Sequence, residues 1–288
     1  MPPTRKHLVI VRAGDRSLHP GWTDSLDRRD WDLVISYYGE DPSRFRGPGD
    51  RRIDDPGPKW TGLHALLTRE RFWREYDYVW LPDDDLAIDQ AAVNRLFARS
   101  AEFGLELAQP ALSWRSYYSH LITIRHPSFL ARFTDFIEIM APCFRREFLE
   151  VCLPLLGETQ SGWGLDWILP RRQRKGALGC AIVDDAEMTH TRPVGGPNYA
   201  ALRGGVNAED EGRTLAARYG VLRSLPQVLA AIERDCRHLN GAIPEQAARL
   251  QELLGKDAAA FLASRLRTET SHTLVATARR NDAGRPGS

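Results

Sequence analysis

Two kinds of segment follow each other along the chain. Short apolar runs rich in β-branched residues end at turn-forming residues, as in strands that are buried in a sheet. Longer stretches carry apolar residues at helical spacing. Their alternation predicts an α/β fold in which a mixed, mostly parallel, Rossmann-like central sheet is flanked by helices.

The expected strands cover residues 8–11, 33–38, 76–81, 105–112, 117–125, 137–144 and 181–183. One expected helix begins near Trp60, and two others cover residues 91–103 and 146–156. Residues 41–58 are crowded with Pro, Gly, Asp and Arg and have no apolar period, so we expect a long surface loop there.

The composition changes near residue 207. We expect a catalytic domain over residues 1–207 and a helical C-terminal extension over 208–266, with helices at 212–219, 226–239 and 244–266. Residues 267–288 have little to bury and are predicted to be a disordered tail.

Charge excludes some classes of partner. The 288 residues include 39 Lys plus Arg and 38 Asp plus Glu, so a net charge of +1 provides no broad field for nucleic acid or anionic lipid. The four cysteines are scattered, which favours reduced thiols. The apolar run at residues 8–11 is too short for a signal peptide core or a transmembrane segment, so a cytoplasmic protein is expected.

The first candidate site is the acidic cluster Asp83, Asp84 and Asp85, directly after a strongly apolar run. In an extended segment Asp83 and Asp85 share a face, whereas Asp84 points elsewhere. Adjacent carboxylates repel each other, and a divalent cation would compensate them while offering open positions to phosphate oxygens. The alternatives are a solvated acidic turn and capping of the next helix by Asp85 and Asp89.

His190 follows a later strand-like run and is a candidate third ligand of the divalent cation, besides Asp83 and Asp85. An imidazole nitrogen would favour Mn²⁺ over Mg²⁺, which prefers oxygen more strongly. The alternative is a purely structural histidine.

A second candidate site is the stretch Gly162, Trp163, Gly164, Leu165 and Asp166. Glycines permit tight turns and close approach of a ligand, and the Trp163 ring offers an apolar face to a sugar. Asp166 could then take a proton from an acceptor hydroxyl. Equally, Asp166 could cap a short helix, with Trp163 packing in the core.

Three charged residues are candidates for donor contacts. Arg12 and Asp15 flank the turn after the first strand, where a base or ribose could lie, and Lys59 could meet phosphate. The alternative for each is a charged residue that is simply solvated at a strand or helix end.

Several motifs occur in a fixed order: LVIVRAGD at 8–15, GPKW at 57–60, YDYVWLPDDDL at 76–86, EIMAP at 138–142, SGWGLD at 161–166 and THTRP at 189–193. Over residues 7–200 the chain resembles a plant and bacterial family catalogued as a domain of unknown function and grouped by fold with GT-A glycosyltransferases. Its plant members carry membrane anchors, and we expect no such anchor in this chain.

The resemblance implies a GT-A fold whose D-x-D motif binds a divalent metal and the diphosphate of a nucleotide sugar. Asp83 and Asp85 match the two acids, Asp84 matches a position that often contacts the donor, and His190 matches a late histidine ligand. Asp166 matches the base of inverting enzymes, although Leu165 stands where a glutamate is usual.

The predicted function is therefore metal-dependent transfer of a sugar, with inversion, from a nucleotide-sugar donor to a hydroxyl of a glycan, lipid, protein or small-molecule acceptor. Clustered aspartates also occur in metal-dependent phosphoesterases and nucleotidyltransferases, which is the first alternative. A non-catalytic carbohydrate- or nucleotide-binding protein with the same fold is the second.

Overall fold

The computed structural model describes residues 5–47, 51–174, 178–193, 202, 205–241 and 244–266. Its strands are β1 (His7–Ala13), β2 (Trp31–Tyr37), β3 (Arg51–Asp54), β4 (Tyr78–Trp80), β5 (Leu86–Ala87), β6 (Leu107–Leu112), β7 (Phe129–Thr134), β8 (Cys143–Arg145), β9 (Cys180–His190), β10 (Val228–Glu233) and β11 (His238–Asn240). Its α-helices are α1 (Lys59–Glu70), α2 (Gln90–Glu102), α3 (Arg146–Leu156), α4 (Leu165–Ile168), α6 (Ala208–Arg218) and α7 (Pro244–Leu266). Short 3₁₀ turns are η1 (His19–Trp22), η2 (Leu26–Arg28), η3 (Phe72–Glu75), η4 (Leu121–Thr123) and η5 (Pro170–Arg172).

One sheet runs through the molecule in the order β11-β10-β7-β9-β6-β8-β4-β1-β2-β3, and β5 pairs with β9 off this path. Strands β1, β2, β3, β4, β6, β9 and β10 run in one direction, and β7, β8 and β11 run in the other. The predicted α/β class with a mixed, mostly parallel central sheet is confirmed.

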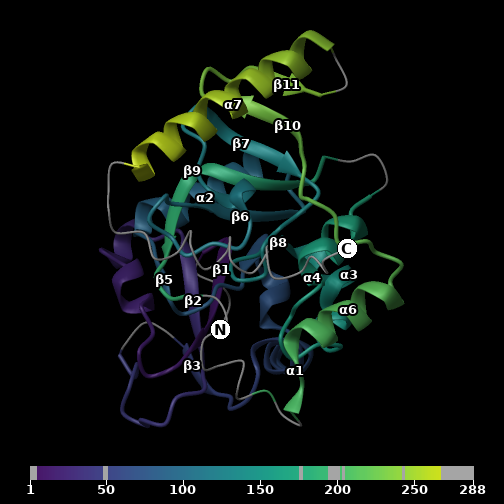
Figure 1. Ribbon diagram of the computed structural model, residues 1–288. Coiled ribbons are helices and arrows are strands. Elements are labelled where there is room, and N and C mark those ends of the chain that lie inside the picture. Colours follow the sequence, from purple (N-terminus) through teal and green to yellow (C-terminus); the bar gives the residue numbers. More distant parts are fainter. Residues whose placement is uncertain are drawn as a thin grey trace.

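Both faces of the sheet are covered, which explains the unbroken apolar run of β1. Val9 and Val11 pack in a core with α2, whereas Leu8 and Ile10 pack in a second core with α1 and α3. Helices α1, α3, α4 and α6 lie together beside the second core (Figure 1).

The C-terminal region departs from the prediction of helices alone. The helix expected at 226–239 is wrong, because β10 and β11 occupy that stretch and β10 pairs with β7. Ala230, Ala231 and Ile232 are buried in succession between β7 and β11, so sheet pairing overrides the helical preference of alanine. Helix α7 packs on this part of the sheet through Leu250 and Leu253 (Figure 1).

Three further stretches differ from the expected elements. The strand expected at 117–125 is wrong: the chain forms loops around η4, where the Thr123 hydroxyl donates to the His120 carbonyl at 2.7 Å. Residues 41–58 are not all loop, since β3 lies within them and pairs with β2. Of residues 137–144, only the end enters a strand, β8.

Strand β9 is longer than expected and carries the chain to His190. Its pairing with β6 shifts register after Pro110, and Asp184 lies in the irregular part. There the Asp184 carboxylate accepts from Arg132 Nε and Nη2, both at 2.8 Å, and from the His126 amide at 2.7 Å. This buried ion pair fixes β7 against β9.

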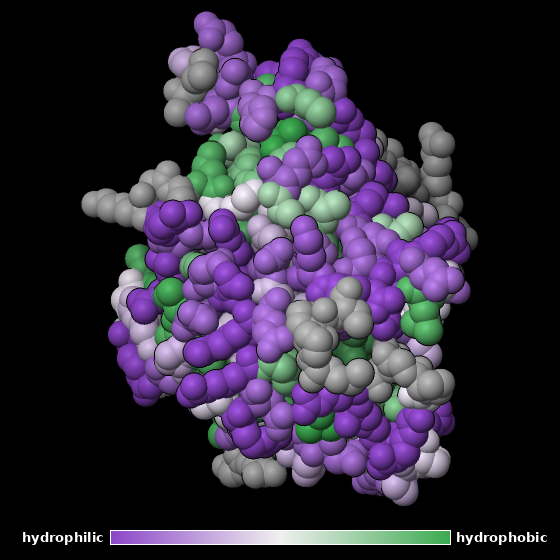
Figure 2. All heavy atoms as spheres, turned by 180° about the vertical axis from the view of Figure 1, so that it is seen from behind, coloured by the Kyte–Doolittle hydropathy of each residue, from purple (hydrophilic) through white to green (hydrophobic). Residues whose placement is uncertain are grey.

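Seen from behind, the surface is mostly hydrophilic, with scattered hydrophobic patches (Figure 2). Within the described residues, no helix is long and apolar enough to span a bilayer. The predicted tail at 267–288 lies outside the described residues, and the predicted boundary at residue 207 stays a prediction.

Candidate functional site

The acidic cluster lies where β4 ends, beside the end of β1. After Trp80 the backbone continues along a neighbouring segment, with the Leu81 amide donating to the Pro142 carbonyl at 2.9 Å and the Asp83 amide to the Met140 carbonyl at 2.6 Å. Strands β1, β4 and β9 run in one direction, so their carboxyl ends reach the same edge of the sheet. Ligands of α/β sheets bind at such an edge.

Lys59, at the start of α1, is paired with the first acid of the cluster. Its Nζ lies 2.6 Å from Asp83 Oδ1, 3.0 Å from the Ile139 carbonyl and 3.4 Å from the Met140 carbonyl. The Asp83 side chain remains 37% exposed. The Asp83 side chain is therefore still accessible to a ligand although it is paired with Lys59.

Asp85 and His190 are brought together by the short β5–β9 ladder, in which Leu86 pairs with His190. His190 Nε2 lies 3.5 Å from Asp85 Oδ2, and His190 Nδ1 lies 2.9 Å from the Tyr117 carbonyl. A carbonyl can only accept, so Nδ1 carries a proton and donates it there. Nε2 then faces a carboxylate oxygen, and only a proton or a metal cation between them makes this contact favourable.

The ionisation of His190 reflects this contact. Burial opposes a charge on the imidazole, but the Asp85 carboxylate outweighs that effect and raises the pKa of His190. Asp85 Oδ1 is buried and has no hydrogen-bond partner among the described residues.

The predicted metal ligands are only partly assembled. Across the ranges that the structure describes, no three His, Cys, Asp or Glu side chains converge closely enough to hold a metal ion. Asp85 and His190 nevertheless fit a divalent cation, because one offers an unpartnered buried oxygen and the other an oriented ring nitrogen. Asp83 lies beside them but is held by Lys59.

Asp84 points to the β1 side of the cluster. Its Oδ2 accepts from the Gly14 amide at 2.7 Å, and its Oδ1 lies 3.6 Å from Arg192 Nη1. The side chain is 5% exposed, and burial raises its pKa against the opposing effect of the Gly14 hydrogen bond. Asp84 thus ties the cluster to the turn after β1.

Arg12 is buried beneath the loop that leads into α1. Its Nη1 donates to Ser36 Oγ at 2.9 Å and to Asp55 Oδ2 at 2.6 Å, and its Nη2 donates to the Gly57 carbonyl. The Arg12 guanidinium is therefore hydrogen-bonded to other residues of the protein, at the end of β2 and in the loop before α1.

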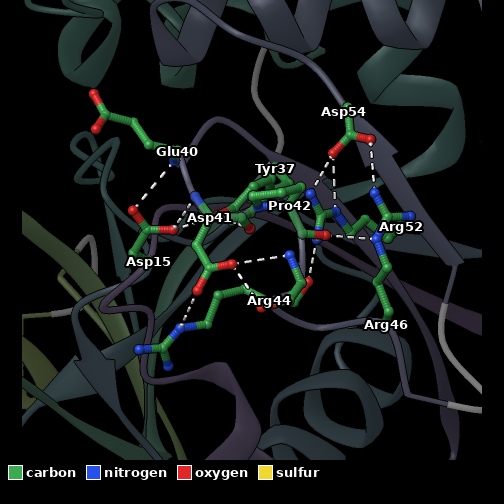
Figure 3. Close-up of polar contacts among 10 residues, drawn as sticks. Asp15, Tyr37, Glu40, Asp41, Pro42, Arg44, Arg46, Arg52 and Asp54 are labelled. Carbon is green, nitrogen blue, oxygen red and sulfur yellow. Dashed lines mark hydrogen bonds and ion pairs between the residues drawn. The ribbon is translucent and has the colours of Figure 1, made fainter.

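Asp15 holds the loop after β2. Its carboxylate accepts from the Tyr37 hydroxyl and from the amides of Glu40 and Asp41, each at 3.2 Å (Figure 3). The Tyr37 hydrogen bond lowers the pKa of Asp15. The hydrogen bonds of Arg12 and Asp15 are thus made to β2 and to the loops at residues 40–41 and 55–57.

Asp166 lies in the first turn of α4, after a loop whose backbone conformation favours glycine at two positions. Gly162 and Gly164 have φ of +81° and +95°. Asp166 Oδ1 accepts from the Ile139 amide at 3.0 Å, and the side chain is 8% exposed. Burial raises the pKa of Asp166 to about 6, against the effect of this hydrogen bond.

Helix α6 supports the same loop. The Glu211 carboxylate accepts from Thr159 Oγ1 and from the amides of Gln160 and Ser161, all at 2.8 Å. Trp163 is half-buried beside it. Helix α6 of the C-terminal region thus holds the loop that leads to Asp166.

Glu138 is a site residue that we did not single out from the sequence. It is 7% exposed, and its carboxyl interacts electrostatically with Asp166, His190 and Asp83. Burial raises its pKa to about 8, and Asp166 adds to the rise. The sequence signal is a carboxylate inside the apolar run 136–141.

No protein-family model matches the chain, so the family resemblance stays a prediction. No curated protein matches it either. Among solved structures, a mycobacterial protein is 16% identical with a TM-score of 0.48, covering 76% of this chain and 76% of its own. TarS of S. aureus in complex with UDP-GlcNAc is 13% identical with a TM-score of 0.49, covering 74% and 66%. Glucosyl-3-phosphoglycerate synthase of Mycobacterium tuberculosis, in complex with Mn²⁺, UDP-glucose and phosphoglyceric acid, is 16% identical with a TM-score of 0.45, covering 77% and 82%.

Proposed function

We propose that the protein is a GT-A-type glycosyltransferase that moves a sugar from a nucleoside diphosphate to a hydroxyl acceptor. The observation that carries the proposal is that one segment, residues 139–140, contacts both the buried carboxylate of Asp166 and the acidic cluster. The Ile139 amide donates to Asp166, and the next carbonyl, that of Met140, accepts from the Asp83 amide. The candidate base Asp166 and the acidic cluster are thus both hydrogen-bonded to the segment at residues 139–140.

The acidic cluster is the proposed donor end of the site. Asp83, Asp85 and His190 would hold a divalent cation, Mn²⁺ or Mg²⁺. Such an ion, when bound, neutralises the charge of the leaving diphosphate. Lys59, whose Nζ lies 2.6 Å from Asp83 Oδ1, would add a positive charge against the phosphates.

The remaining donor contacts are also proposals. Asp84 would meet the ribose or the sugar, and the turn that carries Arg12 and Asp15 would border the nucleotide. The Trp163 ring, half-buried on the loop before Asp166, would face the sugar or the acceptor.

Asp166 is the proposed general base. The carboxylate takes the proton of the acceptor hydroxyl as that oxygen bonds to the anomeric carbon, and the bond to the diphosphate breaks on the opposite side. One displacement of this kind inverts the anomeric centre. A carboxyl with a pKa of about 6 is ionised at neutral pH yet basic enough to accept a proton.

A screen of nucleotide sugars tests the reaction class. The chain is incubated with Mn²⁺ and UDP-glucose, UDP-galactose, UDP-GlcNAc or GDP-mannose, and the nucleotide released is identified by chromatography. Release of the nucleoside diphosphate from one donor is the expected result. Release of the monophosphate would instead indicate phosphoester chemistry, and binding without release would indicate a non-catalytic protein.

A further inference from the structure

Glu138 differs from the other buried glutamates. Among the described residues, Glu106, Glu138 and Glu233 are buried. Glu106 lies 3.0 Å from Arg174 Nε, and Glu233 lies 3.0 Å from Arg237 Nη2. Within the described residues Glu138 has no arginine or lysine partner, and its Oε2 is buried with no hydrogen-bond partner. Glu233 Oε2 also lacks a hydrogen bond, but it lies in the ion pair with Arg237.

A carboxyl in this position is unfavourable for the fold alone. Ile137 and Ala141 on either side are fully buried. The Glu138 backbone is satisfied, because its amide donates to Gln109 Oε1 at 2.6 Å and its carbonyl accepts from Ala141 at 3.3 Å. An apolar side chain could therefore fill the position without an orphaned polar atom.

The position of Glu138 lies between the two ends of the candidate site. The next residue, Ile139, contacts Asp166, and Met140 contacts Asp83. The Glu138 carboxyl is also within electrostatic range of Asp166, His190 and Asp83, which belong to both ends of the candidate site.

In the proposed reaction, the sugar must lie between the leaving diphosphate and the attacking hydroxyl. The proposal assigns the leaving diphosphate to the acidic cluster and the attacking hydroxyl to Asp166. We infer that Glu138 hydrogen-bonds a hydroxyl group of the transferred sugar and so helps to select the donor sugar. This inference rests on the proposed function.

The chemistry of the side chain suits this role. A sugar hydroxyl both donates and accepts hydrogen bonds, and a protonated carboxyl does the same. Burial raises the pKa of Glu138 to about 8, which favours the protonated carboxyl. Ser119 contributes one side-chain hydrogen bond, and Oε2 is left for the sugar.

The test distinguishes the contribution of the sugar to donor affinity from that of the nucleotide. Affinities for UDP, UDP-glucose, UDP-galactose and UDP-GlcNAc are measured by calorimetry with Mn²⁺ for the wild type, Glu138→Ala and Glu138→Gln. For the preferred donor, Glu138→Ala should lower UDP-sugar affinity by about tenfold or more and leave UDP affinity unchanged. Glu138→Gln, whose amide can donate and accept, should retain most of the sugar affinity and acts as the matched control for folding.

Three results would overturn the inference: an equal loss of UDP and UDP-sugar affinity in Glu138→Ala, no loss in either, or a wild type that binds UDP and every UDP-sugar equally. A wild type that binds neither UDP nor any UDP-sugar with Mn²⁺ would overturn the proposed function itself. The two failures are therefore distinguishable.

Discussion

Burial and hydrogen bonding act in opposite directions on the Asp166 carboxyl. Burial disfavours the carboxylate, and the Ile139 amide favours it. Burial is the larger effect, and the resulting pKa of about 6 is well above that of an ordinary aspartate. A base with this pKa loses its ionised form in mildly acidic solution.

We therefore expect turnover to fall as the pH falls through about 6, by about tenfold per unit below that value. Asp166→Asn should lower turnover by about 10²- to 10⁴-fold and remove this dependence, while donor affinity stays unchanged. A pH–rate profile of both chains with the donor found in the screen checks this. Wild-type turnover in Asp166→Asn would show that another group is the base.

The sequence predicts some residues of the site better than others. Asp83 and Asp85 could be located because a strongly apolar strand ends beside them. Glu138 interrupts an apolar run, but no local pattern shows that its carboxyl lies within electrostatic range of Asp166 and Asp83, which are distant in sequence. The contact of Asp85 with His190 likewise depends on the β5–β9 register, which no local pattern reveals.

The loop before α4 is the element on which the position of Asp166 depends. Gly162 has a φ of +81°, and a Cβ there would lie 2.1 Å from Trp60 Nε1 and 2.6 Å from Ile139 Cδ1. Trp60 is buried and cannot yield easily. A side chain at Gly162 must therefore displace the loop and the carboxylate behind it.

Gly162→Ala should lower turnover by about 10²-fold, because small displacements of catalytic groups are costly. Gly104→Ala is the matched control, since Gly104 also has a positive φ, +62°, but a Cβ there would meet no atom of the described residues within 4 Å. Both variants should lose roughly 1 kcal/mol or more of unfolding free energy in urea. Equal turnover in the two would contradict the role of this loop.

At the scale of elements, strands with strong local patterns could be predicted and those defined by distant partners could not. β1, β2, β4 and β6 combine β-branched or apolar runs with turn signals. β10 is different, because an Ala-rich segment takes its conformation from pairing with β7. Edge strand β3 lies in a stretch rich in Pro, Gly and Arg, and β2 supplies its pairing.

On the scale of the whole molecule, the sheet brings residues far apart in sequence to one edge. β1, β4 and β9 end there with Gly14, the acidic cluster and His190. Helix α6 supports Asp166 from outside the first 207 residues through Glu211. The fold therefore supplies the shared edge that the proposed chemistry needs.

The central claim is that the acidic cluster binds a divalent cation together with a nucleoside diphosphate. Calorimetry with UDP in the presence and absence of Mn²⁺ tests it on the wild type and on Asp83→Asn/Asp85→Asn. Asp235→Asn, an exposed acid on the turn between β10 and β11, is the control. We expect Mn²⁺-dependent UDP binding in the wild type and the control and its loss in the double variant. The Tm of the wild type and the control should rise when Mn²⁺ and UDP are added, since a ligand at 100 times its Kd adds about 2.7 kcal/mol to the free energy of unfolding. Equal Mn²⁺-dependent binding by the double variant and the wild type would contradict the claim.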